Sequence, residues 1–340
     1  MMPHPGRPVE GPAAWHGKDL ADPGSWLKVL PSAILDRLNA DLERVRDKKF
    51  GEISRADFGP NPYFDEIRNE VLNGKGFVLI RGIDTRDRTI EEIGRLFWAV
   101  GMHFGAPLPQ NAKGHLLGHV KDLGVRANDP GVRIYQTNER QFFHTDSCDI
   151  VGLVCLRKAK RGGLSSLASA WMAHNEVFRR DPELAEALLE PIWTDHRGEQ
   201  APGTNPWYSI PVFNWHRDRL IGSYQRKYIE SAQRFPGVPR LGAKQVKALD
   251  LLDEVLEEIA LRMEFEPGDI QFVHNHQMFH DRTAFEDDPR APRHLLRLWL
   301  TCEDDWELPP VFAERYGTVE RGKRGGIRIP GLELTVSLTP

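Results

Sequence analysis

Apolar side chains recur at helical spacing through most of the first hundred residues. Between residues 32 and 48 they return every three or four positions, which predicts an amphipathic helix. The same spacing predicts a second helix over 64–72. A third is expected from Thr89 through residue 97, because the acidic residues of its first turn suit the helix dipole. The run GFVLIRGI at 76–83 predicts a short strand between the last two.

Beyond residue 130 the pattern changes to short apolar runs separated by turn residues. Runs of this kind predict strands at 132–137, 149–156, 164–170, 191–196, 208–215 and 219–224. A long helical pattern follows over 243–263, and then two more strand-like runs at 268–274 and 293–301. This order predicts a mainly β fold with helical cover, an α+β class built on an antiparallel barrel or jelly roll. No GxGxxG motif follows a strand, which disfavours a Rossmann fold.

The two ends of the chain differ from its centre. Residues 1–14 are rich in proline and glycine and predict a flexible N-terminal arm. Residues 15–304 carry the periodic segments and predict a single folded domain. Residues 305–340 show no regular period, so we expect an irregular C-terminal tail that lies as a flap on the surface.

Charge and composition narrow the classes of function. The net charge is −4 at pH 7, which gives no general attraction to nucleic acid. Every apolar run is shorter than the roughly 18 residues that a membrane span needs. The N-terminal sequence lacks the apolar stretch of a secretory signal, and no two cysteines form a CxxC pair. We therefore expect a cytoplasmic protein with a small-molecule substrate and neither a nucleic-acid nor a membrane partner. A homo-oligomer is compatible with the sequence.

The segment QFFHTDSC at 141–148 places a histidine and an aspartate two residues apart. On an extended strand His144 and Asp146 point the same way. With a second histidine from elsewhere they would form a two-histidine, one-carboxylate facial triad, whose open positions suit non-haem iron(II) oxygen chemistry. A surface strand whose histidine pairs with a carboxylate accounts equally well for the pair taken alone.

A second informative segment, 268–300, ends in a run with two arginines. If this run is a strand, Arg293 and Arg297 lie on the same largely apolar face. Two guanidinium groups there are costly without an anionic partner. A dicarboxylic co-substrate would provide one, because the forked guanidinium suits a carboxylate. The protein carboxylates of Asp287 and Asp288 would serve equally well.

Motifs in both segments resemble those of the taurine dioxygenase and clavaminate synthase superfamily of iron(II)/2-oxoglutarate oxygenases. In chain order they are HTD at 144–146, GGLS at 162–165, PGDIQF at 267–272, HDRTAF at 280–285 and RHLLR at 293–297. The resemblance runs from about residue 76 to residue 300. It implies a double-stranded β-helix (jelly-roll) core and an enzyme that uses iron(II), 2-oxoglutarate and O2. Such an enzyme oxidises, most often hydroxylates, a C–H bond of a small organic substrate and releases succinate and CO2.

The resemblance also implies roles for individual residues. His144, Asp146 and His280 correspond to the iron ligands, which are the catalytic residues. Arg293 corresponds to the arginine that binds the distal carboxylate of 2-oxoglutarate. Ser165 corresponds to the hydroxyl residue that helps to hold this co-substrate. Arg297 matches a position that binds either the co-substrate or a substrate anion in relatives, so both roles stay open.

Departures from the family pattern leave alternatives open. Relatives often have two asparagines where this chain has His274 and Asn275, and serine or glycine where it has Asp281. His274 and His276 are two residues apart and, with His144, would suit a cupin-like metalloenzyme that needs no 2-oxoglutarate. A non-catalytic 2-oxoglutarate-binding protein is the other alternative.

Polar residues near the motifs are candidates for contacts with the substrate, although ordinary loop polarity explains them as well. They are Gln110, Asn111, Tyr135, Asn138, Tyr224 and Arg226. His196 has no partner nearby in the sequence, and we expect it to be structural or solvated.

Overall fold

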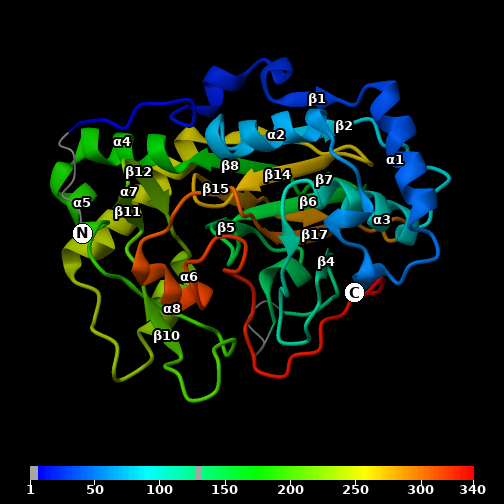
Figure 1. Cartoon of the computed structure of the whole chain (residues 1–340). Coiled ribbons are helices and arrows are strands. Elements are labelled where there is room, and N and C mark those ends of the chain that lie inside the picture. Colours follow the sequence, from blue (N-terminus) through cyan, green and yellow to red (C-terminus); the bar gives the residue numbers. More distant parts are fainter. Residues whose placement is uncertain (1–6, 127–131) are drawn as a thin grey trace.

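The computed structural model describes residues 7–126 and 132–340. Its larger sheet runs in the order β1-β2-β14-β6-β17-β3, with β4 also paired to β17 (Figure 1). All its strand pairs are antiparallel except β1 with β2. The strands are β1 (Leu27–Val29), β2 (Phe77–Arg81), β3 (Ala106–Pro107), β4 (Leu117–Val120), β6 (Ile150–Arg157), β14 (Ile270–His274) and β17 (His294–Thr301).

A smaller antiparallel sheet carries the metal motifs. Its order is β13-β8-β15-β5. The strands are β5 (Gln141–His144), β8 (Ser165–Ser169), β13 (Leu261–Met263) and β15 (Met278–Arg282). A short pair, β7 (Arg161–Gly162) with β16 (Phe285–Glu286), lies beside it. Together the two sheets form the double-stranded β-helix core of an α+β fold, as the sequence predicted.

The central strands of the larger sheet, β14, β6 and β17, are buried on both faces because most of their side chains are apolar. Along β17, Leu296 and Leu298 pack with one core cluster, whereas Leu295 packs with the other. The first cluster includes residues of α1 (Ser32–Arg44), α2 (Pro62–Asn73) and α3 (Ile90–Gly101), so these helices cover that face. The second cluster includes Leu167 of β8, so the smaller sheet covers the other face. Figure 1 shows α1, α2 and α3 on the outside of the larger sheet.

The remaining elements cover the smaller sheet and surround its open end. The helices are α4 (Ala170–Arg180), α5 (Pro182–Ala187), α6 (Arg226–Ala232), α7 (Ala243–Ile259) and α8 (Ala313–Tyr316). Two hairpins pair β9 (Trp193–Asp195) with β10 (Trp207–Ser209) and β11 (Phe213–His216) with β12 (Arg219–Gly222). Among the described residues, no helix is both long and apolar enough to cross a membrane.

Three local predictions were wrong. Ile134–Gln136, expected as part of a strand, is a 3-10 turn, because the Gln136 side chain accepts from the backbone of Arg133 and stabilises the turn. The run 208–215 is divided between β10 and β11, since the proline at 211 cannot donate to a ladder. The late helix ends at Ile259, and the residues after it pair with β8 as β13.

Both ends of the chain pack more closely than predicted. The first six residues of the expected arm lie outside the described residues. Beyond them Val9 and Ala13 are buried, and the backbone of Val9 exchanges hydrogen bonds with the Asn175 side chain. The C-terminal segment is largely irregular but not a surface flap, because Arg324 is fully buried within it. Figure 1 shows this segment crossing the open end of the core from α8 toward β4.

Candidate metal centre

The fold brings the three predicted metal ligands together. In the pairing of β5 with β15, His144 lies directly opposite His280, and their ring centroids are 4.1 Å apart. Asp146 follows β5 and reaches both rings. Its Oδ1 lies 3.8 Å from Nε2 of His144, and its Oδ2 lies 3.6 Å from Nε2 of His280. One ligand atom from each residue falls within 4.8 Å of the others, so the three can contact a common ion.

Hydrogen bonds fix the orientation of these side chains. Nδ1 of His144 donates to the carbonyl of Phe142 at 2.8 Å, so Nε2 presents its lone pair. The Asp146 carboxylate accepts from the Trp299 indole at 2.8 Å and lies 3.4 Å from Nη1 of Arg297. Asn275 accepts from the backbone N–H of Asp146 and donates to its carbonyl, at 2.8 and 2.7 Å. The ligand side chains are thus held by neighbours, which is typical of metal sites.

Burial and charge set the protonation of the cluster. Burial, reinforced by the neighbouring His280, lowers the pKa of His144 to about 3. Burial alone would raise the pKa of Asp146, but Arg297 and the two imidazoles outweigh it and hold that pKa well below its usual value. At neutral pH His144 is therefore uncharged and Asp146 ionised, the forms that bind metals.

A small cavity of about 50 Å³ begins behind the two histidines and ends at two arginines. Arg293 is 4% exposed and Arg282 is 6% exposed. Nη1 of Arg293 and both Nε and Nη1 of Arg282 have no hydrogen-bond partner among the described residues. Buried polar groups normally have partners, so these three atoms point to a ligand in the cavity.

No carboxylate neutralises these guanidinium groups in the part of the chain that the structure describes. Asp287 accepts only from the backbone N–H of Arg293, at 2.7 Å, and the guanidinium itself meets the carbonyl of Gly163 at 3.5 Å. Burial lowers the pKa of Arg293 to about 10. Burial and the nearby charge of Arg293 lower that of Arg282 to about 9. Gly163 has a φ of +68°, and a Cβ there would lie 2.9 Å from Nε of Arg293.

The other two residues predicted at the co-substrate site also line this cavity. The Ser165 hydroxyl donates to Oε1 of Gln271 at 3.3 Å. Arg297 lies between the Tyr135 and Trp299 rings, 4.8 and 4.9 Å from their centroids, and Nε donates to Gln110. Because Arg297 also contacts Asp146, it belongs to both the metal cluster and the cavity wall.

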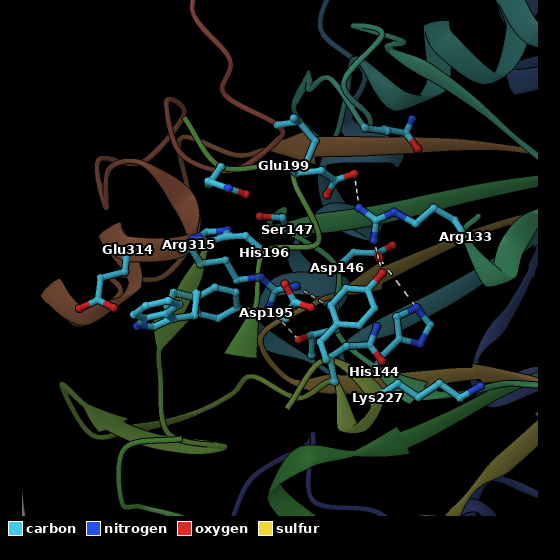
Figure 2. Close-up of a pocket in the computed structure, with 18 of the residues that line it drawn as sticks. Arg133, His144, Asp146, Ser147, Asp195, His196, Glu199, Lys227, Glu314 and Arg315 are labelled. Atoms are coloured by element: carbon cyan, nitrogen blue, oxygen red, sulfur yellow. Dashed lines mark hydrogen bonds and ion pairs between the residues drawn. The ribbon is translucent and has the colours of Figure 1, made fainter. Parts of the chain in front are cut away.

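A larger cavity of about 880 Å³ opens on the other side of His144 and Asp146 (Figure 2). Of the predicted substrate residues, Gln110, Tyr135 and Arg226 line it. Asn111, Asn138 and Tyr224 line neither cavity.

Each of these three has a structural role instead. The Asn111 side chain accepts from the backbone of Lys113 in a turn, and the carbonyl of Asn138 accepts from Phe285. Tyr224 is buried, and its hydroxyl donates to Asp253 at 2.6 Å.

The histidines of the cupin-like alternative do not join His144. His274 and His276 are fully buried and contact two aspartates: Nε2 of His274 lies 2.8 Å from Asp305, and that of His276 lies 3.0 Å from Asp149. Arg324 bridges both aspartates, at 2.6 and 2.7 Å. Because Arg324 already supplies a positive charge to both carboxylates, we interpret this cluster as an internal ion-pair network.

Several residues around the metal centre were not predicted from the sequence. Arg282 lies in the HDRTAF motif and Asn275 lies between the quoted motifs, and only the unpaired atoms of the first and the contacts of the second reveal a role. Arg315 and Arg328 line the larger cavity from the C-terminal segment. No periodic pattern marks that segment, so neither residue could be identified from its sequence.

Residues 50–299 match the model of the family described as taurine catabolism dioxygenase TauD, TfdA family. The chain belongs to this family. The TauD/TfdA chain is thus an iron(II)- and 2-oxoglutarate-dependent dioxygenase, as its motifs implied.

Two relatives extend the match over nearly the whole chain. FR-33289 synthase of Streptomyces rubellomurinus is 31% identical over 92% of this chain and 96% of its own length. A taurine hydroxylase-like protein of Stachybotrys chartarum is 29% identical over 88% of this chain and 82% of its own length.

Among solved structures, an asparagine oxygenase bound to Fe(II), 3-hydroxyasparagine and succinate is similar. It has a TM-score of 0.65 and 14% identity, over 81% of this chain and 93% of its own. At that identity the likeness supports the fold.

Proposed function

We propose that His144, Asp146 and His280 bind the iron(II) of this dioxygenase and that the larger cavity binds a small organic substrate. The convergence of the three side chains carries the proposal: their ligand atoms lie within 4.8 Å of one another, although they come from two distant segments. Two imidazoles and one carboxylate leave positions open on the metal, as oxygen chemistry requires. When bound, iron(II) and 2-oxoglutarate would activate O2, which is the oxidant, and the keto acid would leave as succinate and CO2.

The small cavity is the proposed site of 2-oxoglutarate. Arg293 and Arg282 would both bind the distal carboxylate, since together they have three buried nitrogen atoms without partners. A carboxylate is the anion that a pair of forked guanidinium groups suits best. Ser165 lies on the wall of the same cavity, and its hydroxyl would donate to the co-substrate in place of Gln271. This assignment goes beyond the single arginine that the sequence implied.

The residues around Asp146 keep it ionised and oriented. Arg297 and Trp299 both contact Oδ2, while Asn275 holds the backbone on either side of the side chain. We therefore assign Arg297 to the metal cluster as a positioning residue. Its guanidinium is also on the wall of both cavities, where it separates the co-substrate from the substrate.

The larger cavity supports a small-molecule substrate. Tyr135, Trp193, Trp207 and Tyr208 line it, and such aromatic walls exclude water from a bound organic molecule. The net charge of −4 argues against nucleic acid as the target. All three cysteines are free and buried, which supports the proposed cytoplasmic location.

Binding and turnover test the proposal. Under anaerobic conditions the purified chain is expected to bind iron(II) and then 2-oxoglutarate, and in air to release succinate slowly without a substrate. His144→Ala is expected to abolish metal binding and succinate release. His216→Ala, a histidine of the β11–β12 hairpin, serves as the matched control and is expected to behave like the wild type. Equal metal binding and turnover in the wild type and His144→Ala would reject the assignment.

A further inference from the structure

The positively charged residues that line the larger cavity fall into two groups. Most have a carboxylate partner: Arg133 pairs with Glu199, Arg140 with Asp281, Arg226 with Asp250, and Arg297 with Asp146. Three have none among the described residues: Lys227, Arg315 and Arg328. Lys227 and Arg328 are exposed, so water solvates their charges. Arg315 is half-buried, and its charge needs another explanation.

Arg315 bonds only to neutral acceptors. Nη2 donates to the carbonyl of Thr145 at 2.8 Å, and Nη1 donates to the hydroxyls of Thr145 and Ser223 at 3.2 and 3.4 Å. The side chain extends from α8 with the Tyr208 and Tyr316 rings each 5.6 Å away. These contacts fix the guanidinium in one place without neutralising it.

The position of Arg315 relates it to the metal centre. Thr145 stands between His144 and Asp146 in the chain, and consecutive Cα atoms are about 3.8 Å apart. A group bound to Arg315 would therefore lie close to the iron. Figure 2 shows Arg315 and His196 in the cavity that also holds His144 and Asp146. Burial and the charge of Arg315 lower the pKa of His196 to about 4, so this imidazole is neutral and can donate a hydrogen bond to a ligand.

The charges near the iron do not balance without a further anion. Iron(II) carries two positive charges and Arg282, Arg293, Arg297 and Arg315 carry four more, whereas dianionic 2-oxoglutarate and Asp146 carry only three negative charges between them. Arg282 and Arg293 lie at the co-substrate cavity and Arg297 contacts Asp146, so Arg315 is the half-buried guanidinium on the substrate side that has no anionic partner among the described residues. Glu314, the adjacent acid, is exposed, and its carboxylate accepts from the backbone of Ser209 instead.

We propose that Arg315 binds an oxyanion of the substrate, so that this enzyme oxidises small anionic molecules at a carbon within a few bonds of the charged group. The proposal rests on the proposed function and narrows its substrate class. A carboxylate and a phosphonate or phosphate group share the required chemistry, because each presents paired oxygens to the guanidinium fork. His196 would donate to the same oxyanion.

Calorimetry on the anaerobic enzyme loaded with iron(II) and 2-oxoglutarate tests this. The probes are butyrate, propylphosphonate and neutral 1-butanol, which have similar apolar parts. The wild type is expected to bind both anions more tightly than 1-butanol, and the tighter anion identifies the oxyanion that the site prefers. Arg315→Gln is expected to weaken anion binding about tenfold and to leave 1-butanol unchanged. Arg315→Lys, which keeps the charge and loses the fork, is expected to fall between the two.

Arg321→Gln is the matched control, an exposed arginine of the same segment that does not line the cavity. It is expected to bind all probes like the wild type. Equal affinity of the wild type for 1-butanol and the anions, or binding of none of the probes, would overturn the proposal. So would an Arg315→Gln variant that binds the anions normally, or that loses 2-oxoglutarate and anions alike, since the latter is a purely structural effect. Failure of the wild type to bind 2-oxoglutarate is seen in the loading step and would reject the proposed function instead.

Discussion

The described part of the chain contains two clusters of histidine and aspartate with similar spacing, and they differ in what surrounds them. The cluster of His274, His276 and Asp305 is closed, because Arg324 lies against the carboxylates of Asp305 and of the neighbouring Asp149. The cluster of His144, Asp146 and His280 is open, with a cavity on either side of it. Residue types at ligand spacing therefore do not define a metal site. The difference lies in the room left for an ion, because cavities lie beside the open cluster, whereas a fully buried guanidinium bridges the carboxylates at the closed one.

The closed cluster is expected to matter for stability. Arg324→Met leaves two buried carboxylates without their shared partner, which is expected to lower the free energy of unfolding by about 3–5 kcal/mol. Urea denaturation of the metal-free chain measures this. Arg321→Met, which removes an exposed arginine nearby, is expected to change it by less than about 0.5 kcal/mol. Equal stability of the two variants would show that the closed cluster is not held by Arg324.

The open cluster is expected to matter for ligands. Arg293→Met and Arg282→Met each remove a guanidinium from the small cavity and are expected to weaken 2-oxoglutarate binding by about 2–5 kcal/mol, more than tenfold. Binding of 2-oxopentanoate, which has a methyl group in place of the distal carboxylate, is expected to stay unchanged. Anaerobic calorimetry measures the affinity of each variant for both keto acids, and the ratio of the two affinities isolates the contribution of the distal carboxylate.

The exposed Arg290→Met is the control for this comparison. If Arg282→Met weakens the binding of both keto acids equally, Arg282 supports the fold and does not contact the distal carboxylate.

Asn275 connects the two clusters, since it follows His274 in the chain and holds the backbone of Asp146. Asn275→Asp keeps the shape but cannot donate to the carbonyls of Asp146 and Cys148, and iron(II) affinity is expected to fall by about 1–3 kcal/mol. Asn214→Asp is the matched control, a buried asparagine that donates to the carbonyl of Pro211. It is expected to lose stability and to keep its iron affinity. The same iron affinity in both variants would show that Asn275 does not contribute to iron binding.

The smallest effect is expected at Ser165. Ser165→Ala removes one neutral hydroxyl from the small cavity. It is expected to weaken the binding of 2-oxoglutarate by about 0.5–1.5 kcal/mol and to leave metal binding unchanged. A loss as large as that of Arg293→Met would mean that the hydroxyl, and not the guanidinium pair, anchors the distal carboxylate.

Local sequence patterns predicted the parts of the molecule that short-range geometry controls. Alternation along the strand-like run correctly predicted that Arg293 and Arg297 share a face: both line the small cavity, whereas Leu296 and Leu298 pack on the opposite face with the cluster under the helices. The path of the irregular C-terminal segment, by contrast, depends on tertiary contacts such as that between Gly326 and Ser147. For this reason the position of Arg315 in the larger cavity could not be predicted from the sequence. Arg282 was visible in its motif, but only the unpaired nitrogen atoms gave it a role.

An anaerobic titration of the metal-free chain with iron(II) tests the central claim most directly. The account predicts one equivalent of iron bound per chain, lost in Asp146→Ala and in His280→Ala, because, of the two clusters in the described residues, the open one accepts a cation and the closed one does not. Two equivalents in the wild type, or one equivalent that survives both substitutions, would contradict it.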